Sequence, residues 1–255
     1  MTEKGPAERR KGFSRKSRSG LAFLLLGLSL LPLWALRGAS EDHPLDFRPS
    51  LWVGWSGRGG MPALAVTGLS PESPREAWIL LPGEGGAGTF LQEGMERSGV
   101  ETASEFLVPP GATFSRGVER LGESLRIRRM TLCEPLRGKN PGETLALEVA
   151  REGGALQRCS PCRDGAGGCL WQGTLGEGSF SLERPAPGEW QGSWQNRAGD
   201  SLLCFRYPAT GVLEVLWKGE RVLLLPQTMP GGWRRVPLPG GKTEGNAPAF
   251  LPAFL

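Results

Sequence analysis

The chain has 255 residues and a formal net charge of +4, and its 39 glycines and 22 prolines make up about a quarter of it. Residues 1–20 carry seven cations and two acids, a net of +5, so residues 21–255 sum to −1. The pI near 9.0 therefore belongs to the leader. Because a nucleic-acid partner needs a basic face on the folded part, we expect none.

The N-terminus has the three-part layout of an export signal. The basic leader precedes sixteen uncharged, mostly apolar residues from Leu21 to Leu36, and Gly38 and Ser40 satisfy the small-x-small rule for cleavage. A helix of this length spans roughly 24 Å, less than the roughly 30 Å of a hydrocarbon core. We expect residues 1–40 to be a cleaved signal peptide, or a signal anchor that holds the protein to the membrane. The rest is exported to the cell envelope: periplasmic, secreted or inner-membrane anchored.

The leader, which ends in Gly20 before this apolar stretch, is similar to the prepilins of type IV pili and type II secretion systems. The resemblance implies cleavage after the glycine and an apolar helix that continues into a β-sheet head closed by cysteines. Leu25 stands where that family usually has glutamate, and Pro32 interrupts the helix. A minor pilin-like component is therefore an alternative interpretation.

Residues 41–50 are typical of a linker, and residues 51–143 of a mixed α/β region. Short apolar runs lie at 51–53 and 64–66, a buried strand is indicated at 77–81, and a short helix at 89–98. A stronger helix follows, because Phe114, Val118, Leu121 and Leu125 fall on one helical face. Thr113 is placed to cap its N-terminus.

Residues 144–238 favour an antiparallel β region, as a meander or small sandwich. The segment 144–150 alternates apolar and polar residues, which predicts a strand. Further strands are predicted at 169–175, 180–183, 190–194, 201–207, 212–218 and 221–225. Gly219 and Glu220 fit a two-residue hairpin turn between the last two. The predicted fold class is mainly β (α+β), with an N-terminal signal or anchor helix.

Residues 239–255 form a tail rich in glycine and proline that ends in a tandem PAFL sequence. Proline cannot donate a ladder hydrogen bond, so the tail is a poor candidate for a sheet interior. It is either a frayed end, a strip packed on its own domain, or a docking peptide for a partner.

Five of the nine tryptophans stand in Trp-x-Gly, among them Trp171 and Trp190. Tryptophan is mostly buried on average, so packing in the core is the simplest role. A row of Trp171, Trp190 and Trp194 facing solvent would instead stack on sugar rings, as in a carbohydrate-binding module.

Histidine chemistry has little support, because the single histidine, His43, lies in the linker. We nominate no catalytic residue, although a thiol or paired carboxylates leave an enzyme open. The string from Gly83 to Gly88 matches G-x-G-x-x-G. Pro82 interrupts the junction between the predicted strand and the glycine string, and no βαβ series is predicted after it. We therefore interpret the string as a surface turn and expect no bound nucleotide.

The five cysteines are candidates for disulfides in an oxidising compartment, with one left over. They are Cys133, Cys159, Cys162, Cys169 and Cys204. The simplest arrangement joins the 159–169 loop to the sheet through Cys204 or Cys133. A four-thiolate zinc site from Cys204 and the three loop cysteines is a second possibility. The Cys-Ser-Pro-Cys string resembles the redox motif of thioredoxin-like proteins, but flanking glycines leave no helix to activate its first thiol.

Together these features predict an envelope protein with a non-catalytic binding or structural role and a protein partner. The alternatives are the pilin-like component, the carbohydrate-binding module and the thiol or carboxylate enzyme. No cofactor or resident metal is expected apart from the optional zinc.

Overall fold

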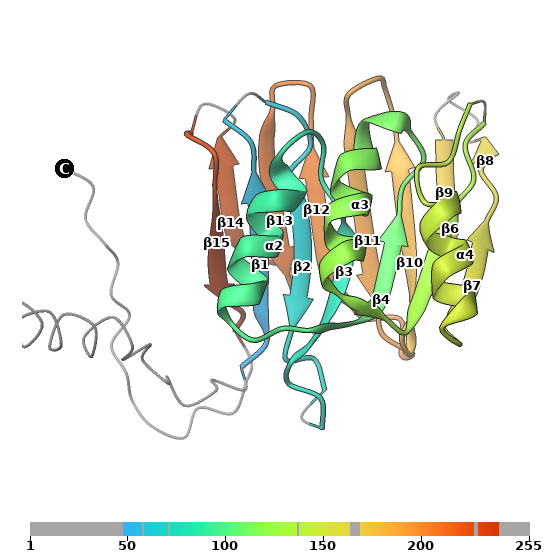
Figure 1. Ribbon diagram of the computed structural model, residues 1–255. Helices are drawn as coiled ribbons and strands as arrows, with labels where there is room; N and C mark the ends of the chain where they lie inside the picture. Colours follow the sequence, from blue (N-terminus) through green and yellow to red (C-terminus); the bar gives the residue numbers. More distant parts are fainter. Residues whose placement is uncertain are drawn as a thin grey trace, which may run out of the picture. The chain divides into compact units, whose positions relative to one another are not determined.

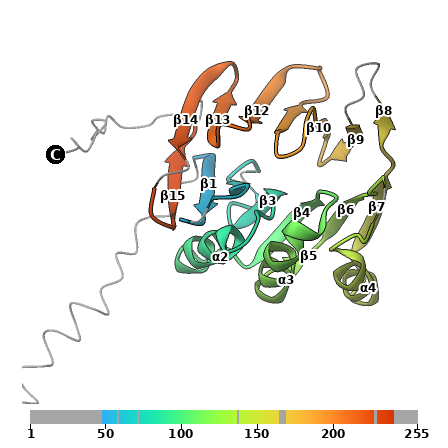
Figure 2. The same ribbon diagram turned by 90° about the horizontal axis from the view of Figure 1, so that it is seen from above.

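The computed structural model describes residues 48–57, 59–70, 72–136, 138–163, 169–226 and 229–239, all within the unit Phe47–Leu255. This unit has three layers: three helices cover one face of a first sheet (sheet A), and a second sheet (sheet B) covers the other (Figure 2). The predicted signal or anchor at 1–40 and the tail after Pro239 lie outside the described residues. Ser50, expected in the linker, already begins the first strand. No helix in the described ranges combines the length and apolar character needed to span a bilayer.

Sheet A has the order β15-β1-β2-β3-β4-β6-β7 (Figure 1), with the short β5 beside β4 (Figure 2). Strands β15, β1, β2 and β3 are antiparallel neighbours, whereas β3, β4, β6 and β7 run parallel. The strands are β1 (Ser50–Trp55), β2 (Ala63–Thr67), β3 (Glu76–Leu81), β4 (Thr102–Val108), β5 (Arg126–Ile127), β6 (Arg129–Cys133), β7 (Ala155–Cys159) and β15 (Gly232–Pro237). Sheet A thus combines residues from both predicted regions, 51–143 and 144–238.

A helix follows each of the first three parallel strands. These are α2 (Ala87–Arg97) after β3, α3 (Ser115–Ser124) with the preceding 3-10 turn η1 (Ala112–Phe114) after β4, and α4 (Glu143–Arg151) after β6. The expectation that no βαβ series follows the glycine string is therefore wrong. It failed because β4 begins with polar residues and β6 has only five residues, so neither stands out as an apolar run.

The two helices predicted before residue 130 are confirmed, but the predicted cap is not. Phe114, Val118 and Leu121 are fully buried, as the shared helical face requires. Phe114 occupies the N-cap position of α3, and no side chain caps the helix. Thr113 instead donates its hydroxyl to the carboxylate of Glu84 at 2.7 Å.

The predicted strand at 144–150 is wrong, because these residues belong to α4. Leu145, Leu147 and Val149 alternate as in a strand, but the sequence ETLALEVAR consists mainly of strong helix formers. Ala146 and Val149, three residues apart, are the buried positions, and Leu147 faces solvent. Helix propensity and the βαβ connection outweigh the period of two.

Sheet B is an antiparallel meander in sequence order, as predicted. Its strands are β8 (Cys162–Arg163), β9 (Cys169–Leu175), β10 (Gly178–Arg184), β11 (Trp190–Gln195), β12 (Ser201–Tyr207), β13 (Val212–Trp217) and β14 (Glu220–Pro226). The β13–β14 hairpin turns at Lys218 and Gly219, both with positive φ, one residue earlier than expected. The mainly β class with helices is therefore confirmed.

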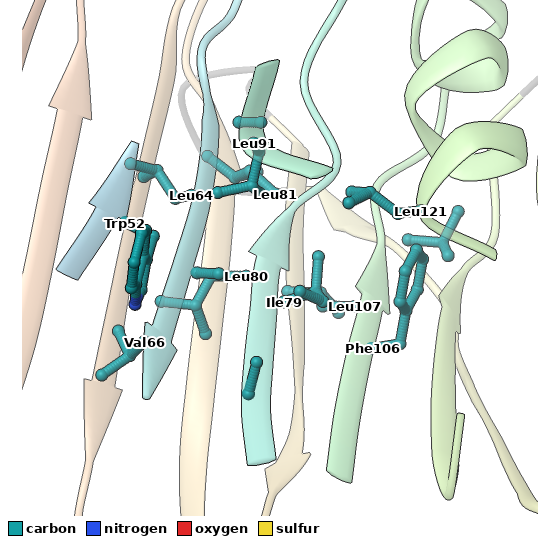
Figure 3. Close-up of a cluster of buried hydrophobic side chains, with 14 of the residues drawn as sticks. Trp52, Leu64, Val66, Ile79, Leu80, Leu81, Leu91, Phe106, Leu107 and Leu121 are labelled. Atoms are coloured by element: carbon teal, nitrogen blue, oxygen red, sulfur yellow. The ribbon is translucent and has the colours of Figure 1, made fainter. Parts of the chain in front are cut away.

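One apolar core runs through all three layers. Figure 3 shows part of it, with Trp52, Leu64, Ile79, Leu91 and Leu121 contributed by strands and helices of the first half of the chain. Glycines let the helices approach closely. A Cβ on Gly117 would lie 2.1 Å from the carbonyl oxygen of Pro82, and one on Gly88 would lie 2.6 Å from the Cα of Gly117. The layer of helices therefore packs at distances that only glycine permits.

Candidate functional site

The carboxyl ends of β3, β4, β6 and β7 meet at one edge of sheet A, which we call the carboxyl edge. Ligands of open α/β sheets bind outside this edge, in the loops that follow the strands. The loops here begin at Pro82, Pro109, Glu134 and Ser160. This edge is therefore the expected location of a ligand-binding site.

The glycine string lies at the carboxyl edge, between β3 and α2, and only its middle, Gly85 and Gly86, forms the surface turn expected from the sequence. Gly83, with φ +76°, and Gly88 are buried. A Cβ on Gly83 would lie 2.8 Å from the Cβ atoms of both Ala63 and Ala87. Gly85 alone is exposed, and a Cβ there would have only Ser56 near it. The glycines of this string thus mainly permit close packing of the chain on itself.

The acidic residue of the string ties three loops together. The backbone N–H of Glu84 donates to the Met61 carbonyl at 2.8 Å, and its Oε2 accepts from the Met61 N–H at 3.1 Å. Its Oε1 accepts the hydroxyl proton of Thr113. Both carboxylate oxygens of Glu84 therefore have partners within the fold, and the loops before β2, after β3 and after β4 are held together.

Four aromatic side chains close the space between the sheets at the carboxyl edge, and we call Phe114, Trp171, Trp190 and Tyr207 the aromatic cluster. All four are buried. The ring centroids of Phe114 and Trp190 are 5.6 Å apart and those of Trp190 and Trp171 6.2 Å. The Trp171 Nε1–H donates to the Glu134 carbonyl at 2.8 Å, and the Tyr207 hydroxyl to the Gly60 carbonyl at 2.9 Å. The cluster is apolar where it packs, and the polar atoms of Trp171 and Tyr207 at its rim are hydrogen-bonded.

This packing agrees with the core role that the sequence favoured for these tryptophans and does not fit the alternative, an exposed row that stacks on sugar rings. Trp171, Trp190 and Trp194 are 2%, 4% and 8% exposed and face the space between the sheets. Sheet A covers the face of sheet B on which they lie, and no pattern within the strands of sheet B indicates this.

A shallow groove of about 550 Å³ lies beside the carboxyl edge, between the glycine string and α3. Its charged groups are two arginines and two glutamates of α3, and Arg120 and Glu123 pair with each other at 3.2 Å. The lining residues are Gly85, Ala112, Thr113, Ser115, Arg116, Glu119, Arg120 and Glu123. Mixed charge on one helix favours no particular ligand.

No protein-family model matches the sequence, and no curated protein matches it. The assignment of function therefore depends on the geometry of the described residues.

The structure brings together two of the five candidate cysteines. Cys133 ends β6 and Cys159 ends β7, directly opposite each other in the parallel pair. All five cysteines are free thiols, so the expected disulfides are not formed in this structure. The thiols of Cys133 and Cys159 share a hydrogen bond, which raises the pKa of Cys133 and lowers that of Cys159.

The other cysteines are separated from this pair. Cys162 lies opposite Leu170 and Cys169 opposite Arg163, so the two side chains point to opposite faces of the β8–β9 ladder. Cys204 is on β12, with β10 and β11 between it and β9. The four-thiolate zinc site from Cys159, Cys162, Cys169 and Cys204 therefore does not assemble. No group of three or more metal-ligating side chains occurs among the described residues, which do not include His43.

A buried polar group that sequence reasoning missed lies at the opposite end of the space between the sheets. Glu105 of β4 is buried, and its Oε1 accepts from Arg129 at 2.9 Å and from the Gly176 N–H at 3.0 Å. Burial raises the pKa of Glu105, an effect partly opposed by the positive charge of Arg129. Its Oε2, the hydroxyl of Thr131 and the Nε1 of Trp194 are buried without a protein partner. No local pattern in the sequence marks Glu105 or Thr131.

Proposed function

We propose that this chain is an exported or membrane-anchored cell-envelope protein with a non-catalytic binding or assembly role. The observation that carries the proposal is the aromatic cluster. It fills the space between the sheets at the edge where α/β enzymes hold their substrates. At the same edge, both carboxylate oxygens of Glu84 are engaged in bonds that hold loops together.

The envelope location rests on the sequence. The basic leader before the apolar segment from Leu21 to Leu36 keeps that end on the cytoplasmic side and directs the remainder outward. If the segment is not cleaved, it anchors the protein to the membrane.

A protein partner is favoured by exposed leucines on neighbouring elements. Leu136 follows β6, Leu147 lies on α4 and Leu156 lies on β7, the last strand of sheet A (Figure 1). The nearest paired charges are Arg158 and Glu143, which bond at 3.0 Å through the two terminal guanidinium nitrogens of Arg158. We infer that the partner presents an apolar segment to these leucines, because three large apolar side chains are exposed on neighbouring elements.

Site-specific crosslinking in cells that make the protein naturally tests the proposal. A photoreactive residue at position 147 should give one crosslinked envelope protein, and Leu156→Asp should abolish that product. Leu224 is a matched control, because it is 54% exposed on β14 of sheet B, compared with 61% for Leu147. A crosslinker at position 224 should give no such product.

Three results would contradict the proposal. Equal crosslinking from positions 147 and 224 would show that the corner has no specific partner. A product with twice the mass of the chain would identify a second copy in place of another protein. Location of the intact chain in the cytosol would remove the envelope role.

A further inference from the structure

Two thiols occupy the ends of the last two parallel strands of sheet A. Cys133 is the final residue of β6 and Cys159 the final residue of β7, and they are directly opposite in register. Neighbouring strands lie about 4.8 Å apart, and residues opposite each other point to the same face. This spacing falls within the Cα–Cα range of disulfides, about 4.4–6.8 Å. The backbone therefore already holds the two residues at a distance that a disulfide can bridge.

The surroundings favour reaction between these two thiols. Both side chains are buried, and Cys159 faces Gly173 of β9, where an added Cβ would lie 2.7 Å from its Sγ. The Cys159 carbonyl also accepts from the Glu134 N–H at 2.8 Å, which fixes the ends of the strands together. Of the two, Cys159 ionises more easily, because the Cys133 thiol donates to it and lowers its pKa. Thiolates, not thiols, attack disulfides.

We propose that Cys133 and Cys159 form a redox-sensitive dithiol, which small-molecule disulfides oxidise to a covalent staple between β6 and β7. This inference does not depend on the proposed binding role. Cys162 is not the partner, although it completes the Cys-x-x-Cys string. It is exposed on β8 opposite Leu170, whereas Cys159 points between the sheets.

The exchange balances with a disulfide RSSR as the oxidant. The Cys159 thiolate attacks one sulfur of RSSR, forms a Cys159–S–S–R bond and releases one RS⁻. Cys133 then attacks the Sγ of Cys159, closes the internal bond and releases the second RS⁻. The two cysteine protons end on the two R thiols, and the protein gives up two electrons. Among the strands that the structure describes, β7 pairs with β6 alone, so local opening at the end of this strand gives the reagent access.

Mass spectrometry of the full chain tests the staple. The purified, reduced protein is treated with glutathione disulfide, blocked with N-ethylmaleimide and digested without reduction. We expect a peptide pair joined through Cys133 and Cys159, two fewer maleimide adducts, and an oxidised form that melts roughly 5–10 °C higher. Cys204→Ser, which changes a thiol remote from the pair, should form the same bond. Cys133→Ser and Cys159→Ser should not.

The disulfide map of the wild-type protein tests the proposed Cys133–Cys159 bond even if a variant fails to fold. A bond mapped between Cys159 and Cys162, or glutathione adducts with no internal bond, would overturn the assignment. An oxidised form that melts at the same temperature as the reduced form would overturn the role as a staple.

Discussion

The space between the two sheets ends differently at its two edges. At the carboxyl edge, the aromatic cluster is closely packed, and its polar atoms on Trp171 and Tyr207 donate to backbone carbonyls. At the opposite edge, Trp78 and Trp194 also pack edge to face, with centroids 4.6 Å apart. There, however, the Trp194 Nε1 and one oxygen of Glu105 have no protein partner.

The two edges differ in how their buried polar atoms affect the stability of the fold. A buried polar atom without a partner costs about 1–3 kcal/mol, whereas a satisfied one contributes about 1 kcal/mol. The hydrogen-bonded polar atoms at the carboxyl edge therefore contribute to the stability of the fold. The opposite edge carries a buried carboxyl group whose ionisation is unfavourable. Substitutions of matched residues at the two edges test this contrast.

The largest effect is expected from Trp190→Ala at the carboxyl edge. It removes contacts with Phe114 and Trp171 and leaves a large cavity, which should lower the free energy of unfolding by about 3–5 kcal/mol. Trp194→Ala at the opposite edge should cost less, because it also removes an indole N–H without a partner. Urea unfolding of both variants measures the difference. An equal or larger loss for Trp194→Ala would contradict the contrast.

Sheet B and the first two helices could be predicted from the sequence because each carries a regular apolar period. Strands such as β13, with Leu213 and Val215 buried between partly exposed neighbours, alternate clearly. The parallel strands β4, β6 and β7 could not be predicted in this way. Strands covered on both faces lack alternation, and β7 is mostly exposed. The helix α4 was mistaken for a strand because its three alternating apolar residues match the period of a strand.

The site was harder to predict, because its chemistry depends on contacts between elements far apart in sequence. Cys133 and Cys159 become neighbours only when β6 and β7 pair in parallel through α4. The burial of Trp171 and Trp190 depends on sheet A covering sheet B, which no pattern within sheet B can show. Glu105 is buried against Gly176, 71 positions away. Residue type identified the cysteines and tryptophans as candidates, and topology decided what they do.

Two substitutions of Glu105 separate the effect of its hydrogen bond from that of its charge. Glu105→Ala leaves the Gly176 N–H without its acceptor and should cost about 1–3 kcal/mol. Glu105→Gln should be at least as stable as the wild type at pH 7, because the amide oxygen can still accept from Gly176 and Arg129 without burying a charge. Loss of the ion pair costs little, since Arg129 is 43% exposed. Thermal and urea unfolding at pH 7 compare the three proteins, and strong destabilisation by Glu105→Gln would contradict the unfavourable ionisation.

The pH dependence of Glu105 has a definite sign. Its pKa in the folded state is raised above the ordinary 4.5, so above that pH the folded protein holds this proton more tightly than the unfolded chain. Its contribution to stability is therefore complete below about pH 4.5 and is lost as the pH rises through the folded-state pKa. Because one proton is involved, the loss cannot exceed about 1.4 kcal/mol per pH unit. Unfolding of the wild type minus that of Glu105→Gln should show this decline between pH 4 and 8. A difference that stays constant or rises would contradict it.

Tyr207→Phe probes a satisfied bond at the carboxyl edge. The variant keeps the ring in the aromatic cluster but leaves the Gly60 carbonyl without its donor. We expect a loss of about 1 kcal/mol in the free energy of unfolding. Chemical denaturation with an unchanged m-value would show that the effect is on stability and not on the compactness of the unfolded chain.

Thr131→Val is the matching change among the unsatisfied groups and should act in the opposite direction. Thr131 is fully buried on β6, and its hydroxyl has no protein partner. Valine has nearly the same shape and a high strand propensity, so the variant removes an uncompensated polar group without leaving a cavity. It should raise the free energy of unfolding by up to about 1 kcal/mol, measured under the same conditions as Tyr207→Phe. Destabilisation would contradict this prediction and indicate that a buried water molecule is hydrogen-bonded to the hydroxyl.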